Sequence, residues 1–402
     1  MATELSSRIA RLRGLASFEP RPLRPGFSGR GPFNWPDRLR EMRQRLLDQA
    51  NEPFVGITTD GTAQPGLYDI QPTGVSTRPI LDAANAFLAA LTAEQRAIVS
   101  FGINDPAWQT WSNISPFVVR HGIHLDALSE GKRELALGLP RATLSAAGYQ
   151  TARDVMRLNH TIAEISGGWD ELGEWMYWIS LFGTPSATEP WGWQIDGHHL
   201  IVNCLVLGDQ IVVTPCFMGS EPVVAESGKY AGTSVFEVEE ERGYTLMQAL
   251  SPDQQDTARI GMEQHGDVVA SAASDNVQVP YAGLRFTEMS SAQQRLLLDT
   301  VETYIGRIRP GHAEIRLEEV QRHLGDTYFA WIGACDDTSP FYYRVQSPVV
   351  LIEFDHQRGI HLQNDVPTRA HIHTVVRTPN GNDYGKDLLR QHYAQSPHHN
   401  GR

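Results

Sequence analysis

The strongest chemical signal in the chain is a pair of histidines separated by one residue, His371 and His373. Residues 372–376 are mostly β-branched and the turn-forming residues 380–382 follow, so the pattern predicts a short strand. Alternate side chains of a strand point the same way, and both imidazoles would therefore project from one face. Neutral imidazoles placed in this way are good metal ligands, although either histidine would also serve as an ordinary hydrogen-bonded residue.

A second pair, His198 and His199, lies in residues 191–200. In a regular strand these neighbours point to opposite faces, so only one of them can join a given metal ion unless a bulge re-aims them. The polar residues Gln194 and Asp196 put His198 on the more polar face. We therefore predict His198 as the third ligand, with His199 in reserve as a ligand or as its partner. The alternative is one packed and one surface histidine.

Glu353 interrupts an apolar run over residues 348–354. Burying an ionised carboxylate is costly unless it is paired or coordinates a cation. Glu353 is therefore either a surface residue at the end of a strand, or a ligand, a base or an orienting carboxylate. Arg344 is a candidate partner for Glu353 or for an anionic substrate group, with a surface salt bridge as the alternative.

Two further carboxylates, Asp383 and Asp387, follow the His-x-His strand. The position of Asp383 favours an N-cap of the last helix. The alternative is that these carboxylates fix a histidine tautomer by accepting the second ring N–H of a ligand.

Those side chains are carried by a chain of 402 residues with 41% hydrophobic and 20% charged residues, the balance of a soluble globular protein. A net charge of −13 argues against a nucleic-acid binder, which needs clustered Lys and Arg. No apolar run reaches the length of a membrane span, and the first residues contain no secretory signal pattern. The three cysteines (Cys204, Cys216 and Cys335) lie far apart, which favours buried thiols in a reducing, cytoplasmic environment.

The distribution of apolar residues predicts an α+β fold, with a helical N-terminal half packed on a mostly antiparallel β-sheet in the C-terminal half. We expect one integrated domain in four stretches: an irregular arm (1–33), a helical region (34–170), an α+β region that carries the histidines (171–395) and a polar tail (396–402). The regular βαβ alternation and the Gly-x-Gly-x-x-Gly motif of dinucleotide-binding proteins are absent.

Within the second half the pattern predicts individual elements. We expect strands over 177–182, 199–207, 210–214, 327–332, 341–345, 349–354 and 371–377, and helices over 244–260, 291–305, 314–324 and 386–394. Gly208-Asp209 is a hairpin signal, and residues 215–222 are expected to form a loop that leaves this hairpin.

Taken together, the motifs resemble one family over residues 154–393, the largely uncharacterised domain of unknown function 3500. The motifs that carry this resemblance are Trp191-Gly-Trp, Gly197-His-His-Leu200, Thr214-Pro-x-Phe-x-Gly219, Tyr342-Tyr-Arg, Glu353-Phe, His371-Ile-His-Thr and Asn382-Asp-Tyr-Gly-x-Asp-Leu-Leu389. The resemblance implies that the His-His, Glu and His-x-His segments belong to one shared site, but it brings no activity with it. The chain departs from the family pattern at Ala370, often Asn, at Cys216, often Thr or Ser, and at Gly219-Ser-Glu-Pro222.

These residues favour a metal-dependent enzyme that acts on a small molecule. Zinc held by His371, His373 and one of His198 and His199 would activate water for hydrolysis or hydration, and Glu353 would take the proton. The same ligands would suit iron or copper in an oxidoreductase. The third alternative is a non-catalytic binding protein, in which structural zinc would be expected to use more cysteine. The sequence leaves the oligomeric state open.

Overall fold

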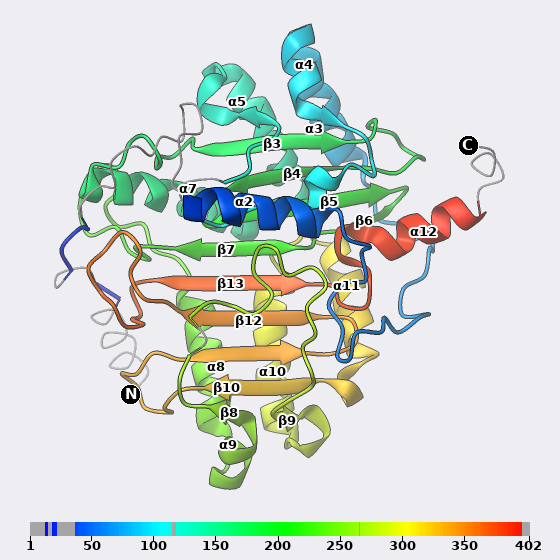
Figure 1. Cartoon of the computed structure of the whole chain (residues 1–402). Helices are drawn as coiled ribbons and strands as arrows, with labels where there is room; N and C mark the ends of the chain where they lie inside the picture. Colours follow the sequence, from blue (N-terminus) through cyan, green and yellow to red (C-terminus); the bar gives the residue numbers. More distant parts are fainter. Residues whose placement is uncertain (1–12, 15–17, 22–36, 115–117, 265, 396–402) are drawn as a thin grey trace.

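The computed structural model describes residues 13–14, 18–21, 37–114, 118–264 and 266–395. Its centre is one 13-stranded mixed sheet (Figure 1). The strands are β1 (Ser100–Phe101), β2 (Ile123–His124), β3 (Tyr177–Phe182), β4 (Trp191–Gly197), β5 (Leu200–Leu207), β6 (Gln210–Val212), β7 (Cys216–Ser220), β8 (Arg259–Gly261), β9 (Leu284–Arg285), β10 (Tyr328–Ile332), β11 (Tyr342–Gln346), β12 (Leu351–His356) and β13 (Ile372–Arg377).

The α-helices connect and cover these strands. They are α2 (Asp37–Ala50), α3 (Arg78–Ala90), α4 (Ala93–Val99), α5 (Glu130–Ala136), α6 (Gly138–Thr143), α7 (Ala146–Ser166), α8 (Glu237–Ala249), α9 (Pro252–Ala258), α10 (Ser291–Ile305), α11 (His312–Gln321) and α12 (Lys386–Gln395). Short 3-10 turns lie at Pro106–Gln109, Leu125–Ala127, Phe286–Glu288, Leu324–Asp326 and Asp383–Gly385.

The strand order places segments from both halves of the chain side by side. It runs β1-β3-β4-β5-β7-β13-β12-β11-β10-β8, and all pairs are antiparallel except β1 with β3 and β10 with β8. Helices in the N-terminal half and a mostly antiparallel sheet in the C-terminal half confirm the predicted α+β class. Strands β1 and β2 come from the predicted helical region 34–170 and join this same sheet.

The two faces of the sheet have different covers. Helices such as α8, α10 and α11 pack on one face, and α2 crosses the other face in front of β5 and β7 (Figure 1). Extended segments, including residues 266–282, cover the rest of that second face and enclose an aromatic cluster around Trp108, Trp111 and Phe217. Because both faces are covered, β3, β4, β5 and β7 are buried along their whole length.

Two predicted elements are wrong. Residues 215–222 are not a loop, because Cys216–Ser220 forms β7, a buried central strand between β5 and β13. Prolines at both ends and Gly219 inside made this short segment resemble a turn. The single helix expected over 244–260 is two, α8 and α9, because Ser251 caps a new helix that begins at Pro252.

The remaining strands and helices predicted for the last third of the chain agree with the structure to within a few residues. Most of the predicted arm (1–33) and the whole tail (396–402) lie outside the described residues. In the ranges that the structure describes, no helix is both long and apolar enough to cross a bilayer.

Candidate metal centre

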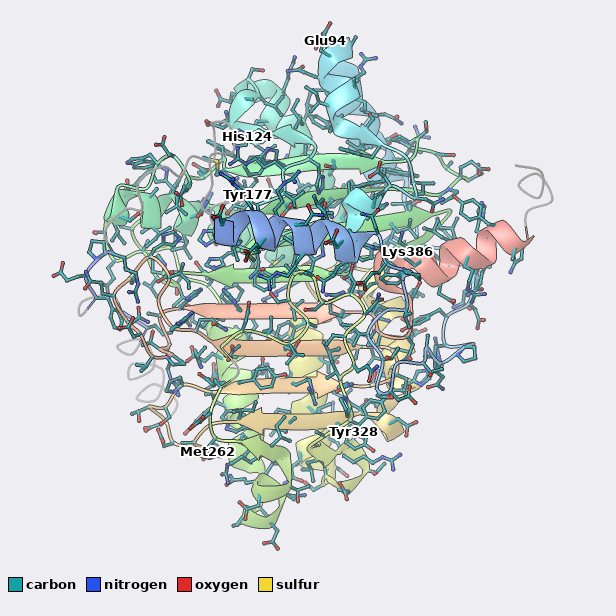
Figure 2. The ribbon with its side chains drawn as sticks, in the orientation of Figure 1. Glu94, His124, Tyr177, Met262, Tyr328 and Lys386 are labelled. Atoms are coloured by element: carbon teal, nitrogen blue, oxygen red, sulfur yellow. The ribbon has the colours of Figure 1, made fainter. Side chains whose placement is uncertain are left out.

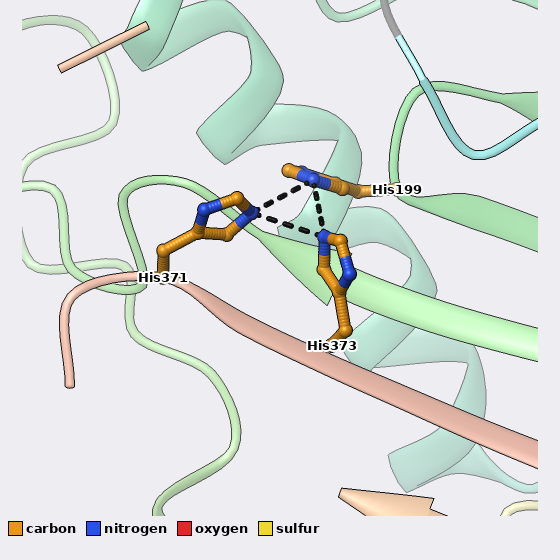
Figure 3. Close-up of side chains that lie close together, drawn as sticks. All are labelled: His199, His371 and His373. Atoms are coloured by element: carbon orange, nitrogen blue, oxygen red, sulfur yellow. Dashed lines mark hydrogen bonds between the residues drawn. The ribbon is translucent and has the colours of Figure 1, made fainter. Parts of the chain in front are cut away.

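Three buried histidines converge at one end of the central strands (Figure 3). The Nε2 atom of His371 lies 3.0 Å from Nε2 of His373 and 3.2 Å from Nε2 of His199, and the third Nε2 pair is 3.1 Å apart. His371 immediately precedes β13 and His373 lies in it. The His-x-His spacing therefore places both imidazoles as the sequence predicts, and His199 completes a triangle of ring nitrogens.

His199 reaches the triangle from a two-residue turn. His198 and His199 connect β4 to β5, whose last paired residues are Gly197 and Leu200. His199 has a φ of 64°, the left-handed conformation that tight hairpin turns need and that non-glycine residues rarely adopt. Its backbone N–H donates to the carbonyl of Asn113 (3.2 Å), and its carbonyl accepts from Gly219 (2.8 Å). These bonds hold His199 in a conformation that would otherwise be unfavourable.

Gly219 makes room for two of the rings. It lies in β7 directly opposite His373 in β13. A Cβ atom at Gly219 would lie 2.8 Å from the His373 ring and 3.3 Å from the His199 ring. A side chain at this position would therefore push the rings apart, and the absence of one allows them to meet over the strand.

The outer ring nitrogens fix the tautomers of two histidines. Nδ1 of His371 lies 2.7 Å from the carbonyl oxygen of Arg358, and Nδ1 of His373 lies 2.7 Å from Oδ1 of Asp267. A neutral imidazole that donates from Nδ1 has a bare Nε2. Two lone pairs therefore face each other 3.0 Å apart between His371 and His373. Such an arrangement is repulsive unless a cation lies between them.

Burial disfavours protonation of these imidazoles, so a proton is not well suited to be the cation between them. Desolvation lowers the pKa of both His199 and His371 well below the usual value, and the neighbouring imidazoles lower it further. Neutral imidazole is the form that binds metal ions. A divalent ion about 2 Å from each nitrogen fits above a triangle of this size.

The three histidines leave a coordination position for a fourth ligand. Within the described ranges, no fourth His, Cys, Asp or Glu belongs to the cluster. Asp267 is 37% exposed on the outer side of His373, so solvent comes close to the centre from this direction. A three-histidine set without a fourth protein ligand is typical of catalytic rather than structural zinc.

The structure brings His199, and not the preferred His198, into the cluster with His371 and His373. Nδ1 of His198 lies 2.8 Å from Oδ1 of Asn159, and the His198 ring stacks on that of His199 with centroids 3.9 Å apart. The carbonyl of His198 accepts a bond from the hydroxyl of Tyr177 (3.0 Å), a residue labelled in Figure 2. The alternation argument assumed a regular strand, but the pair lies in a turn, where alternation does not hold. His198 thus packs against His199 and lies outside the cluster of three ring nitrogens.

We expect His199→Ala to lose most of the bound metal and His198→Ala to keep it. A three-histidine site that loses one ligand binds far more weakly, whereas His198 only packs against a ligand. The two variants remove identical chemistry from adjacent positions, so each is the matched control of the other. Elemental mass spectrometry of the untagged proteins measures the number of metal ions per chain. Equal metal content in the two variants would contradict the choice of His199 over His198 as a ligand.

Glu353 lies on the same face of the sheet but does not join the triangle. It is fully buried, and it accepts bonds from the backbone N–H of Val269 (2.9 Å) and Ala270 (2.8 Å) and from the hydroxyl of Tyr342 (2.6 Å). Of the predicted roles, an orienting carboxylate fits best, because Glu353 fixes the segment that carries Asp267.

Arg344 and Asp383 are also occupied elsewhere. Arg344 lies opposite Glu353 in the sheet, yet these two described side chains form no ion pair, and Arg344 donates to the carbonyl of Pro280 (3.2 Å). Asp383 is not a helix N-cap. It accepts from Nε of Arg377 and from the backbone of Thr378, both at 2.8 Å. Arg377 is four residues along β13 from His373, about 13 Å in a strand.

Three described carboxylates near the triangle have no counterpart among the predicted site residues: Asp267, Asp355 and the buried Glu221, whose Oε2 lies 3.9 Å from Nδ1 of His371. The first is Asp267, which orients His373. Although its partial removal from water opposes ionisation, the proximity of His373 holds the pKa of Asp267 below its usual value. Asp267 lies in a stretch without regular secondary structure, and no local pattern marks it.

The second carboxylate is Asp355, which pairs directly with His373 across the sheet. Directly opposite residues have Cβ atoms about 5 Å apart on the same face. Asp355 is 1% exposed, and its Oδ1 has no hydrogen-bond partner in the structure. Burial raises the pKa of Asp355 well above its usual value, and the charges of Asp267 and Glu353 raise it further. The apolar run that marked Glu353 ends at residue 354, so it did not mark Asp355, which follows on the same face of β12.

Comparison with known proteins gives one match. The family model described as "Protein of unknown function (DUF3500)" matches residues 73–386, which include all three histidines of the triangle. No curated protein and no solved structure matches the chain.

Proposed function

The chain belongs to the DUF3500 family, and we propose that it is a metal-dependent enzyme whose divalent ion is held by His199, His371 and His373. The observation that carries the proposal is the convergence of three buried Nε2 atoms within 3.0 to 3.2 Å of one another. With Nδ1 of His371 and His373 committed to outer acceptors, their inner nitrogens have only a cation to bind.

The proposed reaction is hydrolysis or hydration of a small molecule. Zinc at such a site lowers the pKa of a bound water to near neutrality and so supplies a nucleophile. Asp267 and the Arg358 carbonyl orient the ligand imidazoles and make them more basic. Asp355 is the group best placed to take the proton, because it is buried beside His373, one of its oxygens has no other partner, and a cation bound at the triangle would favour its ionised form. Glu353 is less suited, because both of its oxygens already accept hydrogen bonds.

The three ligands also bear on the two alternative functions, a binding protein with a structural metal and an iron or copper oxidoreductase. A closed structural site would need four protein ligands, and the described residues supply three. The two-histidine, one-carboxylate site of many iron oxygenases is not formed by the described residues either. An oxidoreductase would instead need copper or iron bound by the three imidazoles, and the identity of the bound metal separates this alternative from a zinc hydrolase. The three cysteines are free thiols, which supports a reducing, cytoplasmic setting.

The test is the metal content of untagged protein, compared with a His371→Ala, His373→Ala double variant. We expect close to one zinc ion per chain in the parent and none in the double variant. His312→Ala is the control, because it removes a buried histidine from the start of α11, outside the triangle. The reconstituted parent is then assayed on esters, lactones and amides.

The result separates the alternatives. Zinc in the parent with turnover of such substrates supports hydrolysis. Copper or iron in the parent and none in the double variant would favour an oxidoreductase instead. If the parent bound no metal even after reconstitution with each ion, the proposal of a metal-dependent enzyme would be refuted.

A further inference from the structure

Asn113 is a buried amide that adjoins the metal centre on the side of His199. It is 2% exposed, and its carbonyl accepts the backbone N–H of His199 (3.2 Å). Its side-chain oxygen lies 3.3 Å from the hydroxyl of Ser271, which in turn lies 3.1 Å from Oδ2 of Asp267. Since Asp267 orients His373, Asn113 is linked to two of the three ligands through successive hydrogen bonds.

The side-chain amide of Asn113 has a donor without a hydrogen-bond partner. Its Nδ2 atom is buried and has no partner in the structure. The Ser271 hydroxyl has one hydrogen, and the ionised carboxylate of Asp267 is its stronger acceptor. In the orientation that the structure shows, the buried Nδ2 of Asn113 therefore has a free N–H group.

A buried donor without a partner is unfavourable, and a bound ligand with an acceptor atom can satisfy it. Asn113 accepts a hydrogen bond from the backbone of His199 and is connected to His373 through Ser271 and Asp267. The three histidines leave a coordination position of the ion open. A neutral amide donor beside a bound cation selects for an oxygen acceptor.

We propose that Asn113 binds the substrate through its side-chain N–H, and that the substrate is a small acyl compound, an ester, lactone or amide, whose carbonyl oxygen accepts this bond. The proposal rests on the proposed function, because the acyl group is held between Asn113 and the ion. Phosphate esters fit less well, since a single neutral donor does not match the charge of a phosphate. Asn113 would stabilise the oxygen on which negative charge develops during attack by water.

The test uses protein loaded with cobalt(II), whose visible absorption changes when a ligand reaches the ion. Acetohydroxamate, which carries an acyl oxygen, and azide, which carries none, are titrated into the parent, Asn113→Ala and Asn113→Asp. We expect acetohydroxamate to bind about tenfold or more weakly to Asn113→Ala than to the parent, and more weakly still to Asn113→Asp, which has no N–H to donate. Azide affinity should be the same in the parent and Asn113→Ala, whereas the added negative charge of Asn113→Asp should weaken it.

The backbone bond from His199 to residue 113 survives both substitutions, and an unchanged cobalt spectrum before titration confirms that the centre is intact. Equal acetohydroxamate affinity in the three proteins, with azide binding normally, would overturn the role of Asn113 and leave the metal centre standing. Failure of the parent to bind cobalt at all would overturn both the metal centre and the substrate proposal.

Discussion

Replacing Asp355 with asparagine is expected to lower kcat/KM for the acyl substrate by about 10²–10⁴-fold while the metal stays bound. The asparagine has almost the same size, and it can still accept from Gln357, the hydrogen-bond partner of Asp355 Oδ2. What it cannot do is take a proton. Asp355 lies beside His373 but is not one of the three residues that would hold the ion. Its replacement should therefore affect the chemical step and not the retention of the ion.

The matched control is Glu353→Gln, which makes the same carboxyl-to-amide change two residues away in β12. Gln keeps only one acceptor oxygen for the 266–282 segment, so this variant should be less stable. While it is folded with its zinc in place, it should keep activity to within about tenfold, because Glu353 does not exchange a proton. Steady-state kinetics and metal analysis of both proteins provide the comparison. If Asp355→Asn stayed fully active and Glu353→Gln lost activity with its zinc in place, the roles of the two carboxylates would have to be exchanged.

The second large effect concerns stability. Glu353→Ala is expected to lower the free energy of unfolding by about 3–5 kcal/mol, because it leaves two backbone N–H groups and the Tyr342 hydroxyl without their acceptor. For a protein of ordinary stability this is a large part of the total, about 5–15 kcal/mol. The variant should also bind metal more weakly, because the released segment carries Asp267.

Urea denaturation of the metal-free proteins measures this loss. Glu94→Ala is the control, since Glu94 lies exposed on α4 at the edge of the molecule (Figure 2), and its removal should leave the denaturation midpoint nearly unchanged. A loss below about 1 kcal/mol for Glu353→Ala would show that the three hydrogen bonds do not hold the segment in solution.

The amino-acid sequence by itself determined the elements whose signal is local. The β-branched residues before Arg377 fixed a strand, and the two-residue period of that strand placed His371 and His373 on one face. The apolar run that contains Glu353 likewise marked β12, while it left open whether the carboxylate lies at the surface or is buried and functional. Each of these inferences depends only on neighbours within a few residues, which a sequence pattern contains in full.

The tertiary structure decided the rest of the centre, because its other parts come from distant segments. His199 lies 172 positions from His371, and Asp267 lies 106 positions from His373. The choice of His199 over His198 depends on a left-handed backbone conformation in a two-residue turn. That conformation is held by bonds to Asn113 and Gly219, and Gly219 belongs to a central strand that resembled a loop in sequence. Local preferences fix the strands, but only the pairing of β5, β7 and β13 in one sheet brings the third imidazole to the other two.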